Sequence, residues 1–133
     1  MGDRVSIQFV RPGRPQQRSV VLFSHWGGLG LVDEAYEYAE GLAKLVGDNH
    51  MKPLDRLEPD TVMVDFILQV GPRVAETGEW KHTAHLQGHI AGNLYLKSTD
   101  TEGDNSDNGH WLIPLFRVGD EGFGKRKVEG WQP

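Results

Sequence analysis

A glycine-rich passage, LFSHWGGLGLVDEA, joins an apolar run to an amphipathic one. If the first run is a strand and the second a helix, the turn exposes backbone N–H groups where the helix dipole favours an anion. We therefore predict that Gly27, Gly28 and Gly30 receive a phosphate. His25 and Trp26 add an imidazole and a stacking face for a base or a ribose phosphate. The spacing matches neither the P-loop nor the dinucleotide fingerprint, so a purely structural turn is the alternative.

A second candidate is the acidic loop TDTEGDNSDNGH. Residues 104–109 match the first half of a calcium-binding loop, but the twelfth position is Leu115 rather than glutamate, which excludes an EF-hand. We expect Asp104, Asn108 and His110 to contact ligand hydroxyls. A weaker divalent-metal site and an acidic loop held by Asx turns are the alternatives.

Five further residues, at three places in the sequence, could do chemistry. Arg56 has the two-pronged guanidinium that clamps a phosphate, although an ion pair with a neighbouring carboxylate is equally natural. Asp65 interrupts the apolar run VMVDFI and must be paired, hydrogen-bonded or functional if it is buried. The spacing of His82, His85 and His89 fits a three-histidine zinc site on a helix. We interpret them as part of a solvated loop, because the segment shows no residues that would hydrogen-bond and orient such ligands.

The elements that must position these residues begin with a predicted hairpin. The stretch 5–10 alternates apolar and polar residues, and 19–24 is a continuous apolar run, with the turn RPGRPQQR between them. We place the second strand centrally and the first nearer the edge. Two more predicted strands, 93–98 and 110–116, form a second hairpin with a long loop, and Pro114 favours an edge position for the last strand.

Two helices are predicted between the hairpins. An apolar stripe runs from Val32 to Val46, with Gly47 placed as a left-handed C-terminal cap and Gly41 marking a close packing contact. The run 61–70 could be a buried strand or a buried helix, because short apolar runs fit both. Pro59, Asp60 and Thr61 suit a helix start, so we predict a second helix, ended or kinked by Gly71 and Pro72. The result is an α+β domain over residues 1–118, in the order ββααββ. Its antiparallel sheet of about four strands is covered by helices on one face, and 119–133 is a flexible tail.

Composition excludes several classes of protein. The 133 residues contain no cysteine, which rules out disulfides, thiolate metal sites and a cysteine nucleophile. A formal net charge of -5 argues against general nucleic-acid binding. The sequence has no apolar run of bilayer length and no signal peptide, so we expect a cytoplasmic protein without membrane contact.

Three blocks, SVVLFSHWGG, PLDRLEPDTVMVDFI and GDNSDNGH, resemble blocks in small uncharacterised proteins encoded by tailed phages and by some bacterial and archaeal genomes. The resemblance covers roughly a third of the chain and brings no activity or catalytic residues. It implies that a phage product of this size could sequester a host immune signal, such as a cyclic oligonucleotide or an ADP-ribose derivative.

We therefore expect a non-enzymatic binder of a small phosphorylated, nucleotide-like ligand, needing no cofactor, because no complete catalytic set is present. One alternative is a metal-dependent hydrolase in which His25, His110 and the loop carboxylates hold a divalent ion. Another is an interaction module that presents Trp80, Trp111 and Trp131 to a partner protein. A homodimer is expected from the frequency of symmetric assemblies.

Overall fold

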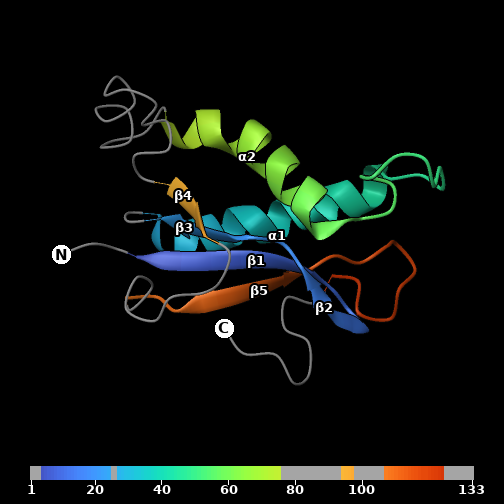
Figure 1. Cartoon of the computed structure of the whole chain (residues 1–133), viewed down its shortest axis with the longest axis horizontal. Helices are drawn as coiled ribbons and strands as arrows, with labels where there is room; N and C mark the ends of the chain where they lie inside the picture. Colours follow the sequence, from blue (N-terminus) through green and yellow to red (C-terminus); the bar gives the residue numbers. More distant parts are fainter. Residues whose placement is uncertain (1–3, 25–26, 76–93, 98–106, 125–133) are drawn as a thin grey trace.

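The structure is a computed structural model that describes residues 4–24, 27–75, 94–97 and 107–124 (Figure 1). It has the α+β class expected, with two helices and a strongly curled sheet. The order is βββααββ rather than ββααββ, because most of the predicted turn RPGRPQQR forms a strand of its own. The elements are β1 (Val5–Arg11), β2 (Arg14–Arg18), β3 (Val21–Ser24), α1 (Gly28–Leu45), α2 (Pro59–Ala75), β4 (Leu94–Lys97) and β5 (His110–Pro114).

The first predicted hairpin is confirmed, with one change. β1 pairs antiparallel with β3 along its first half and with β2 along its second half, so β2 and β3 act as one partner strand broken at Ser19. The prediction that β1 lies near the edge is wrong, because β5 pairs with its other side. The polar residues Ser6 and Gln8 gave β1 the pattern of a half-exposed strand, yet both are buried.

The second predicted hairpin is wrong as a pairing, although both of its strands exist. β4 pairs antiparallel with β3, with Leu94 opposite Ser24, whereas β5 pairs parallel with β1, with His110 opposite Ser6. The sheet is therefore antiparallel except at β5, and β4 and β5 lie on opposite sides of the β1/β3 pair. An apolar pattern specifies which face of a strand is buried, but it does not specify the neighbouring strand.

Both predicted helices are present with different limits. α1 begins at Gly28, four residues before the apolar stripe, so Asp33 and Glu34 lie beyond its first turn. The helix ends at Leu45 and its C-cap residue, Val46, is extended, so the left-handed cap predicted at Gly47 is wrong. α2 continues past the expected stop at residues 71 and 72. An added Cβ at Gly41 would meet no atom within 4 Å, so this glycine does not mark a close packing contact.

The core joins β1 to both helices. Val5, Ile7 and Phe9 share a cluster with the apolar stripe of α1 and with Phe66 of α2. The ring of Phe9 lies 5.4 Å from that of Phe66, and the ring of Tyr38 lies within 5.8 Å of both. Such tilted and edge-on pairs add to the area that the rings bury, so this aromatic group fixes where α1 and α2 sit relative to β1.

The described part of the predicted C-terminal tail packs against the domain. Phe116 is buried, and an added Cβ at Gly122 would lie 2.4 Å from its ring. Phe123 lines a small cavity beside α1. Residues 119–124 thus contact the fold, while 125–133 lie outside the described residues. Among the described helices, none has the length and apolar character needed to cross a bilayer.

Candidate functional site

The junction between β3 and α1 carries the predicted phosphate loop. Ser24, the last residue of β3, is buried and accepts a hydrogen bond from the N–H of Gly27 to its Oγ at 2.7 Å. A Cβ on Gly27 would lie 2.6 Å from that Oγ, so the turn requires glycine at this position. Gly28 has a φ of 56°, in the left-handed region that glycine adopts without a steric penalty. Gly27 is therefore explained by the close approach of Ser24, and Gly28 by its positive φ.

The first turn of α1 has backbone N–H groups that find no acceptor within the helix. The N-cap residue, Gly27, has no side chain with which to cap the helix, and among the described residues the first turn contains no acidic side chain. The first N–H groups of a helix have no acceptor within the helix, and the helix dipole gives this end a partial positive charge. The first turn of α1, which includes Gly30, therefore has the electrostatics that favour a bound anion.

The same end of the sheet contains His110. Val5 pairs with Ser24 on one side of β1, and the next residue, Ser6, pairs with His110 on the other side. Two strand spacings, roughly 10 Å, separate the ends of β3 and β5. The backbone at the start of β5 thus lies at the same end of the sheet as the glycine turn, but the His110 side chain bonds Ser6 and Gln8, on the face of β1 opposite to the one that packs with α1.

His110 is part of a hydrogen-bonded chain across the sheet. Its Nδ1 lies 2.7 Å from Ser6 Oγ, and its Nε2 lies 2.9 Å from Gln8 Oε1. Gln8 donates from Nε2 to the carbonyl of Ser19, so its Oε1 faces the histidine as an acceptor. In the neutral tautomer that donates from Nε2 to Gln8, His110 accepts the Ser6 hydroxyl proton at Nδ1.

This chain of hydrogen bonds decides what His110 can do. Both ring nitrogens are occupied, so neither offers a lone pair to a metal ion in this arrangement. Ser6 is 0% exposed, which removes it as a nucleophile despite the adjacent imidazole. Sequence reasoning missed Ser6 and Gln8, and the signal that could have found them is the polar residue pair inside an otherwise apolar strand.

Asn108 closes the link between β1 and β5. Its Nδ2 donates to the carbonyl of Arg4 at 3.0 Å, and its backbone N–H donates to the same oxygen at 3.0 Å. Arg4 also pairs through Nε with Asp107 at 3.1 Å, and this guanidinium lowers the pKa of the Asp107 carboxyl. Asn108 therefore has a clear structural role beside the one predicted for it.

Arg56 does not join the glycine turn. It donates from Nε to Glu58 at 2.7 Å and also contacts the carbonyl of His50. Its neighbour Asp55 accepts from the N–H of Gly47, just beyond the C-terminal end of α1. An 18-residue helix is about 27 Å long, so Arg56 lies far from the helix start. The ion pair that the sequence left as the alternative is the one present.

Asp65 is half-buried rather than buried, and its carboxylate is hydrogen-bonded. Tyr38 donates its hydroxyl to Asp65 Oδ2 at 2.6 Å, and Gln69 donates to the same oxygen at 2.9 Å. Burial and the neighbouring carboxylate raise the pKa of the Tyr38 hydroxyl above its usual value. The pair therefore joins α1 to α2 and has no contact with the glycine turn.

Several predicted residues lie outside the described part of the chain: His25, Trp26, Asp104 and the histidines at 82, 85 and 89. Among the residues that are described, no group of three metal-ligating side chains occurs.

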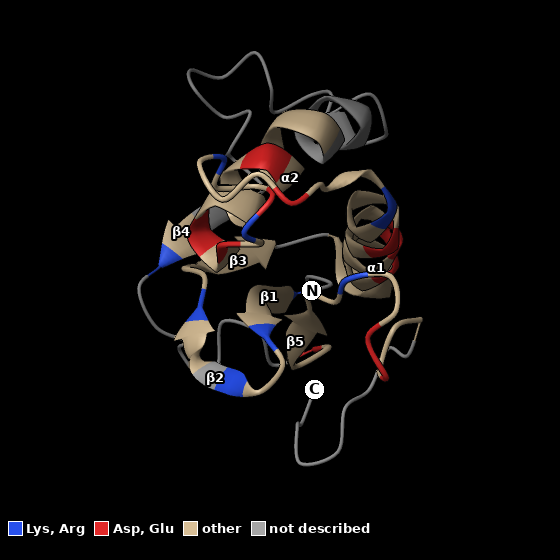
Figure 2. Cartoon of the chain, turned by 90° about the vertical axis from the view of Figure 1, so that its right-hand side faces the viewer, with Lys and Arg blue, Asp and Glu red and all other residues tan. Residues whose placement is uncertain are grey.

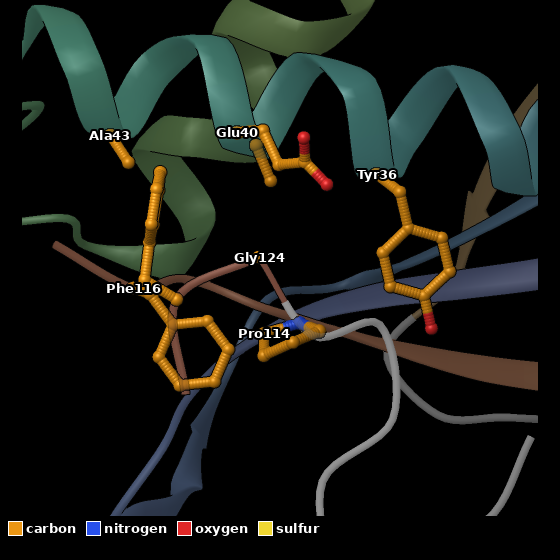
Figure 3. Close-up of a pocket in the computed structure, with 8 residues that line it drawn as sticks. Tyr36, Glu40, Ala43, Pro114, Phe116 and Gly124 are labelled. Carbon is orange, nitrogen blue, oxygen red and sulfur yellow. The ribbon is translucent and has the colours of Figure 1, made fainter. Parts of the chain in front are cut away.

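Two hollows lie along α1, away from its first turn. One has a volume of about 10 Å³ and is lined by Tyr36, Glu40, Pro114 and Phe116 among others, which leaves room for about one water molecule (Figure 3). The other, of about 230 Å³, lies between α1 and α2 and includes Tyr38.

Comparison with protein-family models, with curated proteins and with solved structures finds no match for this chain.

Proposed function

We propose that the protein binds a small phosphorylated, nucleotide-like ligand without transforming it, and that the first turn of α1 receives the phosphate. The observation that carries the proposal is a helix start with no side-chain cap and no acidic residue, built on two glycines with distinct roles. The proposal takes α1 and α2 to cover one face of the sheet, as the sequence predicts. The helix start then opens beside the first residues of β5.

The remaining contacts follow from the chemistry of a nucleotide. His25 and Trp26 precede the helix in the sequence and would supply the stacking face for a base, and Asp104 would contact ligand hydroxyls. Arg56 is no longer part of the proposed site, because its guanidinium is paired with Glu58 at the far end of α1. The backbone therefore has to supply most of the phosphate contacts, as helix starts do in other phosphate sites.

We favour a binder over a hydrolase because of the hydrogen bonds of His110. A metal-dependent mechanism needs a free ring nitrogen on this residue, and both nitrogens are bonded to Ser6 and Gln8. The cytoplasmic location, the homodimer and the sequestration of a host immune nucleotide by a phage product remain predictions. The last of these rests on the three sequence blocks alone.

Isothermal calorimetry tests the binding proposal with a panel of AMP, ADP-ribose, a cyclic dinucleotide and a cyclic trinucleotide. We expect saturable binding of at least one compound, and mass spectrometry of the released compound should find it unchanged. Absence of binding across the panel would contradict the proposal, and recovery of a cleaved product would contradict its non-enzymatic part.

A matched pair of variants locates the site. Gly28→Ala places a side chain on a residue with φ of 56° in the proposed site, and Gly119→Ala does the same at φ of 101° outside it. The backbone penalty is on the order of 1 kcal/mol at Gly28 and larger at Gly119, whose φ lies outside the left-handed helical region, so the control is at least as destabilising. We expect Gly28→Ala to weaken binding at least tenfold and Gly119→Ala to leave it within twofold. Equal effects would show that general destabilisation, and not the helix start, controls binding.

A further inference from the structure

The turn between β1 and β2 places two arginines opposite each other. Arg11, the last residue of β1, pairs with Arg14, the first residue of β2. Pro12 and Gly13 form the turn, and the φ of 81° at Gly13 is the positive value that a tight two-residue reversal needs. Residues opposite each other in an antiparallel pair have Cβ atoms about 4.5 to 5.5 Å apart on the same face. The two arginine side chains therefore leave the hairpin on one face.

The charges of this arginine pair repel each other, and like charges at directly opposite positions reduce the stability of a hairpin. The surrounding sequence does not offset them, because residues 4–32 contain four arginines and neither aspartate nor glutamate. Figure 2 shows basic residues on both strands of the hairpin. A carboxylate that neutralises the pair must therefore come from elsewhere in the chain or from another molecule.

The Asp120 carboxylate acts on Arg11 but does not offset its surroundings. Burial lowers the pKa of the Arg11 guanidinium most, and the charges of Arg117 and Arg14 lower it further. Asp120 raises this pKa, which nevertheless stays below its ordinary value. The Oδ2 of Asp120 also accepts the backbone N–H of Arg117 at 2.7 Å. The positive potential at Arg11 is therefore left for a bound anion to neutralise.

Arg11 is oriented before any partner binds. Its Nη1 donates to the carbonyl of Leu115 at 2.9 Å, and the N–H of Leu115 donates to the carbonyl of Val10. A guanidinium has five N–H donors, so this bond leaves others for a partner. Arg11 is half-buried, whereas Arg14 is exposed. A partner that binds both arginines therefore has to order only one of them, which lowers the entropic cost of binding.

The two guanidinium groups fit a pair of carboxylates. Each planar guanidinium forms two parallel hydrogen bonds with one carboxylate. Acidic residues at alternate positions of an extended peptide lie on one face, about 6.5 to 7 Å apart, which two long side chains starting about 5 Å apart can match. The net charge of -5 repels a long polyanion such as nucleic acid. A short segment meets mainly the local arginines, because salt screens charges beyond roughly 8 Å.

We propose that Arg11 and Arg14 form a docking site for a short, extended acidic segment of a partner protein, with one carboxylate on each guanidinium. The site is far from the glycine turn, because Val5, opposite Ser24, lies at the other end of β1. Six residues of strand measure roughly 20 Å. The interaction therefore goes beyond ligand binding at the start of α1 and does not depend on it.

Nuclear magnetic resonance of the isotope-labelled full chain tests the proposal with a nine-residue peptide of glycine and serine that carries two aspartates at alternate positions. We expect the side-chain Nε–Hε signals of Arg11 and Arg14 to shift and to saturate together at millimolar peptide. At the same ionic strength, the peptide with asparagines in place of the aspartates, free acetate and inorganic phosphate should each bind at least tenfold more weakly. Equal binding by any of these three, or tighter binding of a single-stranded oligonucleotide, would overturn the proposal.

Variants tie the binding to the arginine pair. Arg14→Ala should weaken peptide binding at least fivefold, and Arg14→Lys, which keeps the charge but loses the planar fork, at least twofold. Arg4→Ala removes an equal charge near the opposite end of β1 and should change binding less than twofold. Gly28→Ala should leave peptide binding unchanged, so that failure of the nucleotide site and failure of this site are distinguished. Equal losses from Arg14→Ala and Arg4→Ala, or peptide-induced shifts confined to the first turn of α1, would overturn the proposal.

Discussion

The C-terminal end of α1 is held by other segments of the chain, whereas its N-terminal end has no side-chain cap. At the C-terminal end Gly47 donates its N–H to Asp55 Oδ1, and Arg117 donates to the carbonyls of both Gly47 and Asp55. At the N-terminal end, among the described residues, Ser24 Oγ accepts the N–H of Gly27, the residue before the helix. The chain segments that follow α1 are thus tied to Asp55 and Arg117, whereas at the N-terminal end a bound ligand is what we propose.

The largest expected effect on the free energy of unfolding comes from a substitution near the C-terminal end of α1. Arg117→Ala removes a charged donor from two carbonyl groups and leaves both without it, so we expect a loss of about 2 to 3 kcal/mol in the free energy of unfolding. Urea denaturation measures it, and ligand affinity at the other end of α1 should not change once the folded fraction is accounted for. Arg14→Ala, at an exposed position, is the control and should stay within about 0.5 kcal/mol of the natural chain. If Arg117→Ala lost no more stability than Arg14→Ala, the hydrogen bonds of Arg117 would not be what holds the C-terminal end of α1.

A smaller loss is expected at the open end. In Gly27→Ala the new Cβ would lie 2.6 Å from Ser24 Oγ and 3.1 Å from Leu31 Cβ, so Ser24 must move and its hydrogen bond must lengthen. We expect a loss of about 1 to 2 kcal/mol by denaturation. Gly30→Ala is the control for stability, because its Cβ would meet no atom within 4 Å. Equal stability of the two variants would mean that the turn is not tightly constrained.

A substitution in the middle of α1 should raise the free energy of unfolding instead of lowering it. Gly41→Ala improves helix propensity at an exposed position with open space for the Cβ, so we expect a gain of about 0.8 kcal/mol. Thermal unfolding followed by circular dichroism is the measurement. A loss of stability would indicate a packing constraint at Gly41.

The smallest effect concerns the ion pair beside the β5 start. Arg4 lowers the folded-state pKa of Asp107, so the pair adds stability at pH values above the unfolded-state pKa of about 3.9 and loses it as pH falls further. Asp107→Asn should therefore be less stable than the natural chain at pH 7, with the difference shrinking below about pH 4. Denaturation curves over this pH range measure the difference. A difference that stays constant with pH would assign the effect to hydrogen bonding alone.

Local sequence patterns predicted which segments form helices and strands better than they predicted which strands pair with each other. The helix through Val32 follows from its apolar periodicity, and the helix through Thr61 follows from the start signal at residues 59–61. The pairing of β1 with β3 follows from adjacency in the chain. The parallel pairing of β5 with β1 depends on contacts between residues about 100 positions apart, such as Ser6 and His110, which no local pattern contains. Strand order is therefore the part of the fold that sequence reasoning placed wrongly.

The candidate site likewise has one part that the sequence predicted and one part that it did not. The glycine turn was visible because turn chemistry is local, and its two glycines have the conformational reasons that glycine usually has. The chain of hydrogen bonds from Ser6 through His110 to Gln8 was not visible, because it forms only when β5 lies beside β1. Arg56 was assigned to the phosphate because its chemistry fits, but the length of α1 separates it from the turn.

The most direct test of the central claim is a titration of the isotope-labelled chain with AMP, followed by amide proton and nitrogen chemical shifts. If the first turn of α1 binds the phosphate, the amides of Gly28, Leu29 and Gly30 should shift most, and they should saturate together. Amides near Arg56 and Arg117, at the other end of the helix, should move little. Shifts confined to that other end, or no saturable shift in the first turn, would contradict the claim.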